Sequence, residues 1–562
     1  MMNLIRFAAL FIVLFASSSG LQDGPKDFCT DCQAQMHGLL DLIVAGATRE
    51  EVVAKYVDIS VNFFQQPLSA SEGLAERNVD IIIYVVGEKL GTAAPVTAEA
   101  MCFFNDLCPN TDPSYDWSLN LDFVGPKPTP EIPQLPIDGQ PTMEVLQITD
   151  IHIDPTYTPG NNALCGFYSC CRASQGAAPN SSAAAGYWGD YRGCDMPVHA
   201  LQNLLDQAAQ NHPNVAYVMF TGDVMDHANW ERTAELNTDH FTLVMNMLRQ
   251  AFPNVPILPI FGNHESVPAN RVPPSEWNVP TNLKNEWLFQ LAADFWGQWL
   301  PGTADSILRG GFYAYEINPG LKVIALNNNF CYTNNWWLAY DNVDPAGQWA
   351  WLAQELLLSE QAAQKVHIMA HIPPGSSTAW DVCHREYRRI IDRFQNTVKA
   401  QFHGHTHNDH FSIYYDLDEP SRATTLSFTG GSATAYKNYN SNYRIYQVDG
   451  PYDGASYQIL DHTTWFYNLT EANLAGPDVS PNWQILYSFK EAYGVNSLLP
   501  QDLDALAIRM AQDVSLQEQY YRYYVKTGDP SLEKGCDQAC LQKIVCNIVK
   551  TVNTDDCSRL PF

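Results

Sequence analysis

The stretch "QFHGHTHNDHF", residues 401–411, places His403, His405 and His407 at alternate positions, with His410 close behind. The chain has only 15 histidines among 562 residues, so this cluster indicates a local chemical need. Side chains two positions apart in an extended strand face the same way, which predicts that His405 and His407 present imidazoles to two neighbouring ions. Gly404, directly before His405, predicts a close approach of another backbone segment.

Four other apolar runs end in side chains that bind metals. The runs are "MEVLQITDIHID", which ends in Asp150 and His152, "VAYVMFTGDVMDH" in Asp223 and His227, "VPILPIFGNHE" in Asn263 and His264, and "KVHIMAHIPPG" in His371. Open α/β folds place functional groups in loops at strand ends, so five such strands can direct their loops to one point. Each motif alone is a weak signal, but the ordered set is far too specific to arise by chance.

The ordered set D-x-H, GD, GNHE, H and GHTH resembles the calcineurin-like metallophosphoesterase family. The resemblance implies an α/β fold, a β-sandwich flanked by helices, built around two metal ions. It also implies two ligand sets that share Asp223. These sets are Asp150, His152, Asp223 and His407 for one ion, and Asp223, Asn263, His371 and His405 for the other.

Histidine and carboxylate ligands without thiolate suit zinc, and they also admit manganese or iron. Two such ions can acidify a shared water molecule and hold a phosphoryl oxygen between them. His264 is placed to protonate the departing alkoxide, and His227 to donate to the phosphoryl oxygens or share the proton transfer. Both imidazoles are expected to be largely protonated in an acidic compartment. The remaining candidates are interpreted as structural: His403, His410, His367 and His384.

The N-terminus predicts the compartment. Arg6, the apolar run at residues 7–15 and the small residues up to Gly20 are typical of a secretory signal peptide, residues 1–20. No later run reaches the roughly 20 apolar residues that a membrane-spanning helix needs. We therefore expect a secreted or lysosomal protein, or both. Asn180 and Asn468 lie in triplets that accept N-linked glycans.

Fourteen cysteines fall into three even blocks, and in a secreted chain they favour disulfides over metal binding. The blocks are Cys29, Cys32, Cys102 and Cys108; Cys165, Cys170, Cys171, Cys194, Cys331 and Cys383; and Cys536, Cys540, Cys546 and Cys557.

The first block encloses apolar residues at helical spacing, which predicts a small helical unit over residues 25–112. This unit resembles the saposin family, in which short amphipathic helices open to engage lipid. In the family's nested pattern Cys29 pairs with Cys108 and Cys32 with Cys102. The family's third pair, in the middle of the domain, is absent. A generic helical prodomain is the alternative.

Six prolines in "GPKPTPEIPQLPIDGQP", residues 125–141, predict a stiff extended tether. We therefore expect a linker over residues 113–142, a catalytic domain over residues 143–470 and a helical, disulfide-bonded region over residues 471–562. The tyrosine-rich run in this last region is more typical of a packed core than of a cage for a quaternary ammonium group.

The motifs with their neighbours resemble the acid sphingomyelinase family from Cys29 to Cys557. The stretches that carry this resemblance are "TDIHIDPTY", "GDVMDHANW", "GNHESVPANRVPP", "AHIPPG", "FHGHTHNDHF" and "CGFYSCCR". The resemblance implies hydrolysis of sphingomyelin to ceramide and phosphocholine, by water activated between two zinc ions with histidine assistance. It implies these further pairs: Cys165–Cys170, Cys171–Cys194, Cys331–Cys383, Cys536–Cys540 and Cys546–Cys557.

The expected partner is sphingomyelin in membranes or lipoproteins. We expect the protein to be a monomer whose saposin-like helices contact the lipid surface. A net charge of -29 argues against nucleic acid as a partner. Three alternatives remain. The first is a related phosphodiesterase acting on nucleotides, but such enzymes lack the saposin-like segment. The second is a purple-acid-type phosphomonoesterase, which would need a tyrosine ligand that the motifs lack. The third is a catalytically dead lipid-binding protein, which would not explain the intact ligand set.

Overall fold

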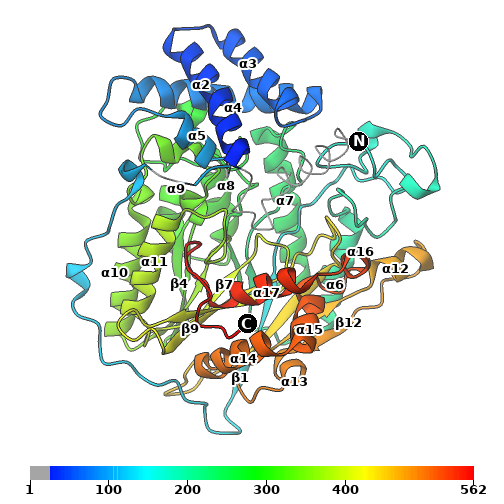
Figure 1. Ribbon diagram of the computed structural model, residues 1–562. Coiled ribbons are helices and arrows are strands. Elements are labelled where there is room, and N and C mark those ends of the chain that lie inside the picture. The colour runs from blue at the N-terminus through cyan, green and yellow to red at the C-terminus, as the bar shows by residue number, and fades with distance from the viewer. Residues whose placement is uncertain (1–25, 106, 110–111) are drawn as a thin grey trace.

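The computed structural model describes residues 26–105, 107–109 and 112–562, so the predicted signal peptide, residues 1–20, lies outside the described residues. Two six-stranded sheets form the centre of the molecule (Figure 1). The first has the order β12 (Gln484–Ser488), β11 (Ile459–Phe466), β10 (Asn442–Asp449), β1 (Thr142–Ile148), β2 (Tyr217–Phe220) and β3 (Ile257–Pro259). The second has the order β4 (Tyr313–Asn318), β5 (Leu321–Ala325), β6 (Lys365–Met369), β7 (Val398–His403), β9 (Ala423–Thr429) and β8 (His410–Tyr415).

The two sheets pack face to face. The rings of Phe402 in β7 and Tyr446 in β10 are in contact, with centroids 4.9 Å apart. The Tyr217 hydroxyl of β2 and His367 Nδ1 of β6 share a hydrogen bond of 3.1 Å. Strands β1, β2 and β3 run parallel to one another, as do β5, β6, β7 and β9. The strands that carry the sequence motifs therefore end at a common edge of the sandwich, and the predicted α/β sandwich is confirmed.

Helices cover the outer faces of the sandwich (Figure 1). They are α6 (Val198–Asn211), α7 (Ala234–Ala251), α8 (Glu286–Trp296), α9 (Ala304–Gly310), α10 (Gln348–Gln361) and α11 (Asp381–Arg393). Helix α7 shows why they form. The Thr233 side chain accepts the Leu236 N–H at its start, and Phe241, Val244 and Leu248 bury one face at helical spacing.

The predicted saposin-like unit is docked on the two-sheet sandwich. Its helices are α2 (Lys26–Val44), α3 (Arg49–Asn62), α4 (Leu68–Lys89) and α5 (Ala98–Phe103). Tyr56 of α3 meets Trp336 edge-on at 6.5 Å, and Tyr84 of α4 meets Trp337 at 6.0 Å. One buried apolar cluster contains residues of both units. The helical unit therefore completes its small core with tryptophans of its neighbour.

The predicted linker is packed along much of its length. Arginines at every fourth position of α11 donate to linker carbonyls: Arg385 to Trp117, Arg389 to Leu119 at 3.3 Å and Arg393 to Val124 at 2.7 Å. Composition predicted a stiff tether, and the arginine row of α11 explains why it lies on the domain. Past residue 131 the linker lies on the surface, where Ile132 and Ile137 are 71% and 78% exposed.

The C-terminal region is helical except for strand β12, which adds an edge strand to the first sheet. Its helices are α12 (Leu469–Ala475), α13 (Phe489–Tyr493), α14 (Pro500–Gln512), α15 (Val514–Tyr524), α16 (Asp529–Lys534) and α17 (Gln538–Cys546). Tyr520 is buried, and Tyr523 stacks on Tyr487 at 4.3 Å. The tyrosine-rich run is therefore part of a core, as its pattern predicted.

Seven disulfides join the described cysteines, and they are the pairs that the family resemblance implies. They are Cys29–Cys108, Cys32–Cys102, Cys165–Cys170, Cys171–Cys194, Cys331–Cys383, Cys536–Cys540 and Cys546–Cys557. Within the described part of the chain, no helix combines the length and apolarity that crossing a membrane requires.

Candidate metal centre and active site

The loops after β1, β2, β3, β6 and β7 bring all seven predicted ligands together. Asp223 lies in the middle: its Oδ2 is 3.4 Å from His152 Nε2 and 3.1 Å from His371 Nε2. His152 Nε2 is also 3.1 Å from His407 Nε2. The bridging position predicted for Asp223 thus agrees with its place between two groups of donors.

The other three side chains complete those two groups. Asp150 Oδ1 lies 3.5 Å from His407 Nε2, on the His152 side. Asn263 Oδ1 lies 3.1 Å from His371 Nε2 and 2.9 Å from His405 Nδ1, on the other side. The division into two groups around Asp223 is the one that the resemblance implies.

Hydrogen bonds fix which ring nitrogens face the centre. The Nδ1 atoms of His152 and His371 lie 2.7 Å from the carbonyl oxygens of Met225 and Thr221, so each Nδ1 carries the proton and each Nε2 offers a lone pair. All seven side chains are buried. Facing carboxylates and imidazole lone pairs are costly in a buried site without a cation between them. The residues present therefore fit a binuclear metal centre.

Electrostatic coupling within the cluster is strong. Burial by itself would lower the pKa of His371, but the neighbouring Asp223 carboxylate raises it to about 9. Burial raises the pKa of Asp150, since a charge there loses its water shell. Ionisable groups that shift one another's pKa values so strongly are typical of a functional site.

Left-handed backbone conformations direct five of the seven ligands. The φ angles are 51° for Asp150, 46° for His152, 62° for Asp223, 72° for His405 and 60° for His407. Such values are uncommon outside glycine and cluster at functional sites. The reasoning from an extended strand was wrong for His405 and His407, because β7 ends at His403 and the chain then turns. Both imidazoles reach the centre because of that turn.

Gly404 makes the predicted close approach. A Cβ atom at this position would lie 2.1 Å from Thr149 Oγ1 and 2.6 Å from Asp150 Oδ2. Only glycine allows the β7 loop to touch the β1 loop at this point. The glycine therefore brings the ligands of two sheets within reach of one another.

The two predicted catalytic histidines lie beside the metal ligands. His264 Nδ1 is 3.2 Å from Asn229 Oδ1, and its backbone N–H donates to Asp223 Oδ1 at 3.0 Å. The His227 ring stacks on Tyr436 with centroids 3.8 Å apart, and its centroid is 4.8 Å from that of His264. Both rings also lie close enough to His152 to count among groups that could hold an ion.

Burial lowers the pKa of both histidines, that of His227 to about 3 and that of His264 well below its usual value. Burial therefore acts against the protonation expected for both histidines in an acidic compartment. The reason is desolvation, which disfavours the imidazolium and which composition alone does not reveal.

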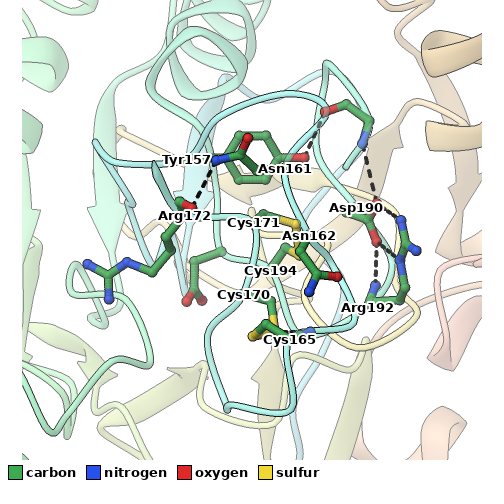
Figure 2. Close-up of a disulfide and its surroundings, with 12 residues drawn as sticks. Tyr157, Asn161, Asn162, Cys165, Cys170, Cys171, Arg172, Asp190, Arg192 and Cys194 are labelled. Atoms are coloured by element: carbon green, nitrogen blue, oxygen red, sulfur yellow. Dashed lines mark hydrogen bonds and ion pairs between the residues drawn. A yellow bond between two sulfur atoms is a disulfide. The ribbon is translucent and has the colours of Figure 1, made fainter. Parts of the chain in front are cut away.

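Asp195 is a site residue that the sequence motifs did not indicate. Its Oδ1 lies 2.5 Å from His227 Nδ1, and its Oδ2 accepts the His227 backbone N–H at 3.0 Å. It adjoins Cys194, whose disulfide to Cys171 fixes the long loop after β1, as Figure 2 shows. No strand-end motif indicated Asp195, because the loop and its disulfide place the carboxylate.

The four histidines interpreted as structural have other partners. His403 Nδ1 lies 2.8 Å from Ser427 Oγ, and His367 Nε2 lies 2.8 Å from the Tyr457 carbonyl. His410 Nε2 lies 3.0 Å from Thr406 Oγ1, and His384 Nδ1 accepts the Gly375 N–H at 3.3 Å. Each ring is held by a neighbouring loop or strand, which agrees with a structural role.

A cleft of about 350 Å³ connects the metal ligands with the saposin-like helices. Asp223, His264 and His407 line one end of it. The other end is lined by apolar side chains of α2, α3 and α4 and the residues that follow them, including Met36, Leu39, Ile59, Phe64 and Ile82. Tyr168, Tyr436 and Tyr439 line the space near the histidines. The cleft therefore joins a polar reaction centre to an apolar channel.

Two family descriptions match the chain in sequence. Residues 143–409 match "Calcineurin-like phosphoesterase", and residues 427–559 match "Acid sphingomyelin phosphodiesterase C-terminal region". Together they cover most of the two sheets, except β8 and the start of β9, and most of the C-terminal region.

Several characterised proteins are similar along most of the chain. A sphingomyelin phosphodiesterase of Homo sapiens is 40% identical over 514 residues, which cover 91% of this chain and 79% of that protein. Sphingomyelin phosphodiesterase 2 of Caenorhabditis elegans is 31% identical, covering 94% of this chain and 88% of that protein. The cyclic GMP-AMP phosphodiesterase SMPDL3A of Mus musculus is 31% identical, covering 76% of this chain and 94% of that protein.

Proposed function

The chain belongs to the acid sphingomyelin phosphodiesterase family and is a phosphoric diester hydrolase, and we propose that it hydrolyses sphingomyelin to ceramide and phosphocholine. The observation that carries this proposal is the continuous cleft between the metal ligands and the apolar helices. A lipid diester needs both ends of that cleft: a polar centre for phosphate and an apolar wall for the chains.

We propose zinc for both metal positions, with Asp150, His152, Asp223 and His407 around one ion and Asp223, Asn263, His371 and His405 around the other. Imidazole and carboxylate donors without thiolate support this choice. Two ions bound there would acidify a water molecule and neutralise phosphoryl oxygens. The chain's own part is to hold these donors rigidly, through the carbonyl contacts of His152 and His371 and the close contact at Gly404.

His264 is proposed to protonate the departing ceramide oxygen, since it faces the cleft and Asn229 orients its ring. His227 is proposed to donate a hydrogen bond to a phosphoryl oxygen, with Asp195 holding its other nitrogen. A lowered pKa makes an imidazolium a stronger proton donor while reducing the fraction that is protonated. The negative charge of a bound phosphodiester would raise the pKa again and so restore part of the protonated fraction.

The saposin-like unit is proposed to bring the cleft to a lipid surface. Val44, Leu68 and Leu90 are large apolar side chains on this unit that are more than half exposed. Such side chains can insert into the boundary between head groups and acyl chains. The cleft tyrosines offer aromatic faces that favour a quaternary ammonium group.

The protein is proposed to act as a monomer outside the cytosol, in the extracellular space, the lysosome or both. Seven disulfides and the absence of a free cysteine among the described residues suit an oxidising compartment. Glycans at Asn180 and Asn468 are proposed on the same grounds. Its strong negative charge supports the absence of nucleic acid among its partners.

The decisive test compares two substrates. Purified protein would be incubated at pH 5 with sphingomyelin vesicles and with a soluble nucleotide diester, each with added zinc and with a chelator. We expect hydrolysis of both to require metal and sphingomyelin to be preferred. The similarity to the mouse cyclic GMP-AMP phosphodiesterase makes nucleotide hydrolysis the competing function, so a preference for the nucleotide would overturn the substrate assignment.

A further inference from the structure

A second cavity lies at the end of the second sheet that is opposite to the metal centre. It has a volume of about 290 Å³ and is lined by Lys365, Val398 and Thr424, at or near the starts of the parallel strands β6, β7 and β9. The metal ligands His371 and His405 follow the opposite ends of β6 and β7. None of the residues that line this cavity lines the catalytic cleft. The two spaces are therefore separate.

Lys399 gives this cavity its positive charge. Burial, together with the nearby Lys365, lowers the pKa of Lys399 to about 8. Among the residues that the structure describes, none accepts a hydrogen bond from or forms an ion pair with its ammonium group. Lys365 reaches only the Asn396 carbonyl, at 3.4 Å. The exposed Glu131 carboxylate attracts Lys399 only at long range, so its ammonium, with Lys365 nearby, favours a bound anion in the cavity.

The rest of the lining combines polar side chains, among them Gln134, Gln395 and Gln458, with an apolar wall. Val398, Leu426, Phe428, Ile459 and Leu498 form the wall. Pockets for drug-sized ligands have volumes of about 300 to 1,000 Å³, so this cavity lies at the lower limit. One alkyl chain fits such a space better than the two chains of a membrane phospholipid.

The linker forms one side of the cavity. Residues 131–134 line it, held by the Glu131 N–H donating to Asn396 Oδ1 at 2.9 Å and by Gln501 Nε2 donating to the Pro133 carbonyl at 3.3 Å. Glu131 is the only acidic side chain in the lining and is exposed. This part of the lining is therefore a short segment with few attachments.

We propose that this cavity binds a single-chain anionic amphiphile, with a phosphate or carboxylate head between Lys365 and Lys399 and an alkyl chain along the apolar wall. The head supplies a hydrogen-bonded partner for the Lys399 ammonium group and a second one for Lys365, and the chain replaces water against the five apolar side chains. This site is independent of the reaction at the metal centre.

A photoreactive ten-carbon alkyl phosphate with a diazirine in its chain tests the proposal. The zinc-loaded full-length protein would be labelled at pH 6, where the probe is anionic and Lys399 is protonated, and the labelled peptides mapped by mass spectrometry. We expect labelling in peptides that contain residues 398–399, 424–428 or 454–459, in addition to any in the saposin-like helices. Lys399→Met should reduce the cavity labelling at least tenfold and leave labelling of the helices unchanged.

Lys322→Met is the matched control, because Lys322 lies on the neighbouring strand β5, pairs with Glu355 and does not line the cavity. Competition separates the contributions of head and chain: decyl phosphate should compete, whereas decanol and inorganic phosphate should compete weakly. Labelling confined to the saposin-like helices, or cavity labelling unchanged in Lys399→Met, would overturn the proposal. Equal competition by inorganic phosphate would show a simple anion site and overturn the assignment of an amphiphile.

Discussion

Asp195 holds His227 in one orientation through two contacts, one to the ring and one to the backbone. We predict that Asp195→Asn lowers kcat by about 10- to 100-fold, which is less than the 10²- to 10⁴-fold contribution of a proton-transfer group itself. KM and bound metal should change little. Asp190→Asn is the control, since Asp190 pairs with Arg192 on the same loop (Figure 2). A loss of metal from Asp195→Asn would show that the carboxylate supports the ligands instead.

His264 follows the ligand Asn263 and has no metal role in the proposed scheme. We predict that His264→Ala slows turnover by about 10² to 10⁴ while the metal content stays near two ions per chain. Metal analysis by mass spectrometry, together with steady-state kinetics, checks both parts. Loss of metal from this variant would make His264 a ligand, a possibility raised by its place near His152 and Asp223.

The sequence predicted which residues come together at the metal centre, but it did not predict the backbone conformations that bring them there. Strand-end motifs identified seven side chains that the structure brings together, because parallel strands end at one edge. The left-handed turns at His405 and His407 could not be predicted, since neither residue is glycine and the turn depends on contacts with the β1 loop. Asp195 was missed because a disulfide, and not a strand, positions it.

The linker is the element whose behaviour differs most from its composition. Proline content predicts stiffness, but the row of arginines on α11 decides that the chain lies on the catalytic domain. Lys127 adds ion pairs to Asp392 at 2.9 Å and to Asp416 at 2.7 Å. No linear motif predicts these contacts, because the partners lie more than 250 residues apart.

Asp416 gives a test of this attachment. Burial alone would raise its pKa, but hydrogen bonds from Lys127 and Gln395 hold the pKa well below its usual range. Such a carboxylate stabilises the fold above the unfolded pKa of about 4, and the contribution is lost as pH falls further. Asp416→Asn should therefore lower the free energy of unfolding by about 1 to 3 kcal/mol at pH 6, and by less at pH 3.

Urea unfolding at both pH values measures this difference, with linker cleavage by a protease as a second readout. Asp418→Asn is the control, since Asp418 also reaches Lys127, at 3.1 Å, but is 84% exposed. Its effect should stay below about 1 kcal/mol. Equal effects of the two substitutions would contradict the importance of the buried contact.

In the whole molecule, the saposin-like helices complete the cleft with their inner side, and their outer side is the proposed lipid contact. We predict that the double variant Leu68→Asp with Leu90→Asp slows hydrolysis of sphingomyelin in vesicles at least tenfold, because each apolar side chain contributes about 1.5 to 3 kcal/mol when removed from water. Hydrolysis of a soluble diester should be unchanged. Both side chains are more than half exposed, so folding is preserved.

Leu474→Asp is the control for that experiment. Leu474 is 83% exposed on α12, outside the saposin-like unit, and its substitution should leave both activities intact. Vesicle flotation measures membrane association directly. If the double variant binds vesicles as well as the unmodified protein, the lipid contact lies on another face of the molecule.

The tryptophans beneath α3 and α4 hold the helical unit over the reaction centre, and the arginine row of α11 holds the linker that follows it. A separate helper protein would have to reach the enzyme by diffusion, whereas a tethered one is present at an effective concentration in the millimolar range. If the helical unit makes the proposed lipid contact, the enzyme carries its lipid-binding unit on the same chain. Its rate on vesicles should scale linearly with enzyme at any dilution, and added helper proteins should bring little gain.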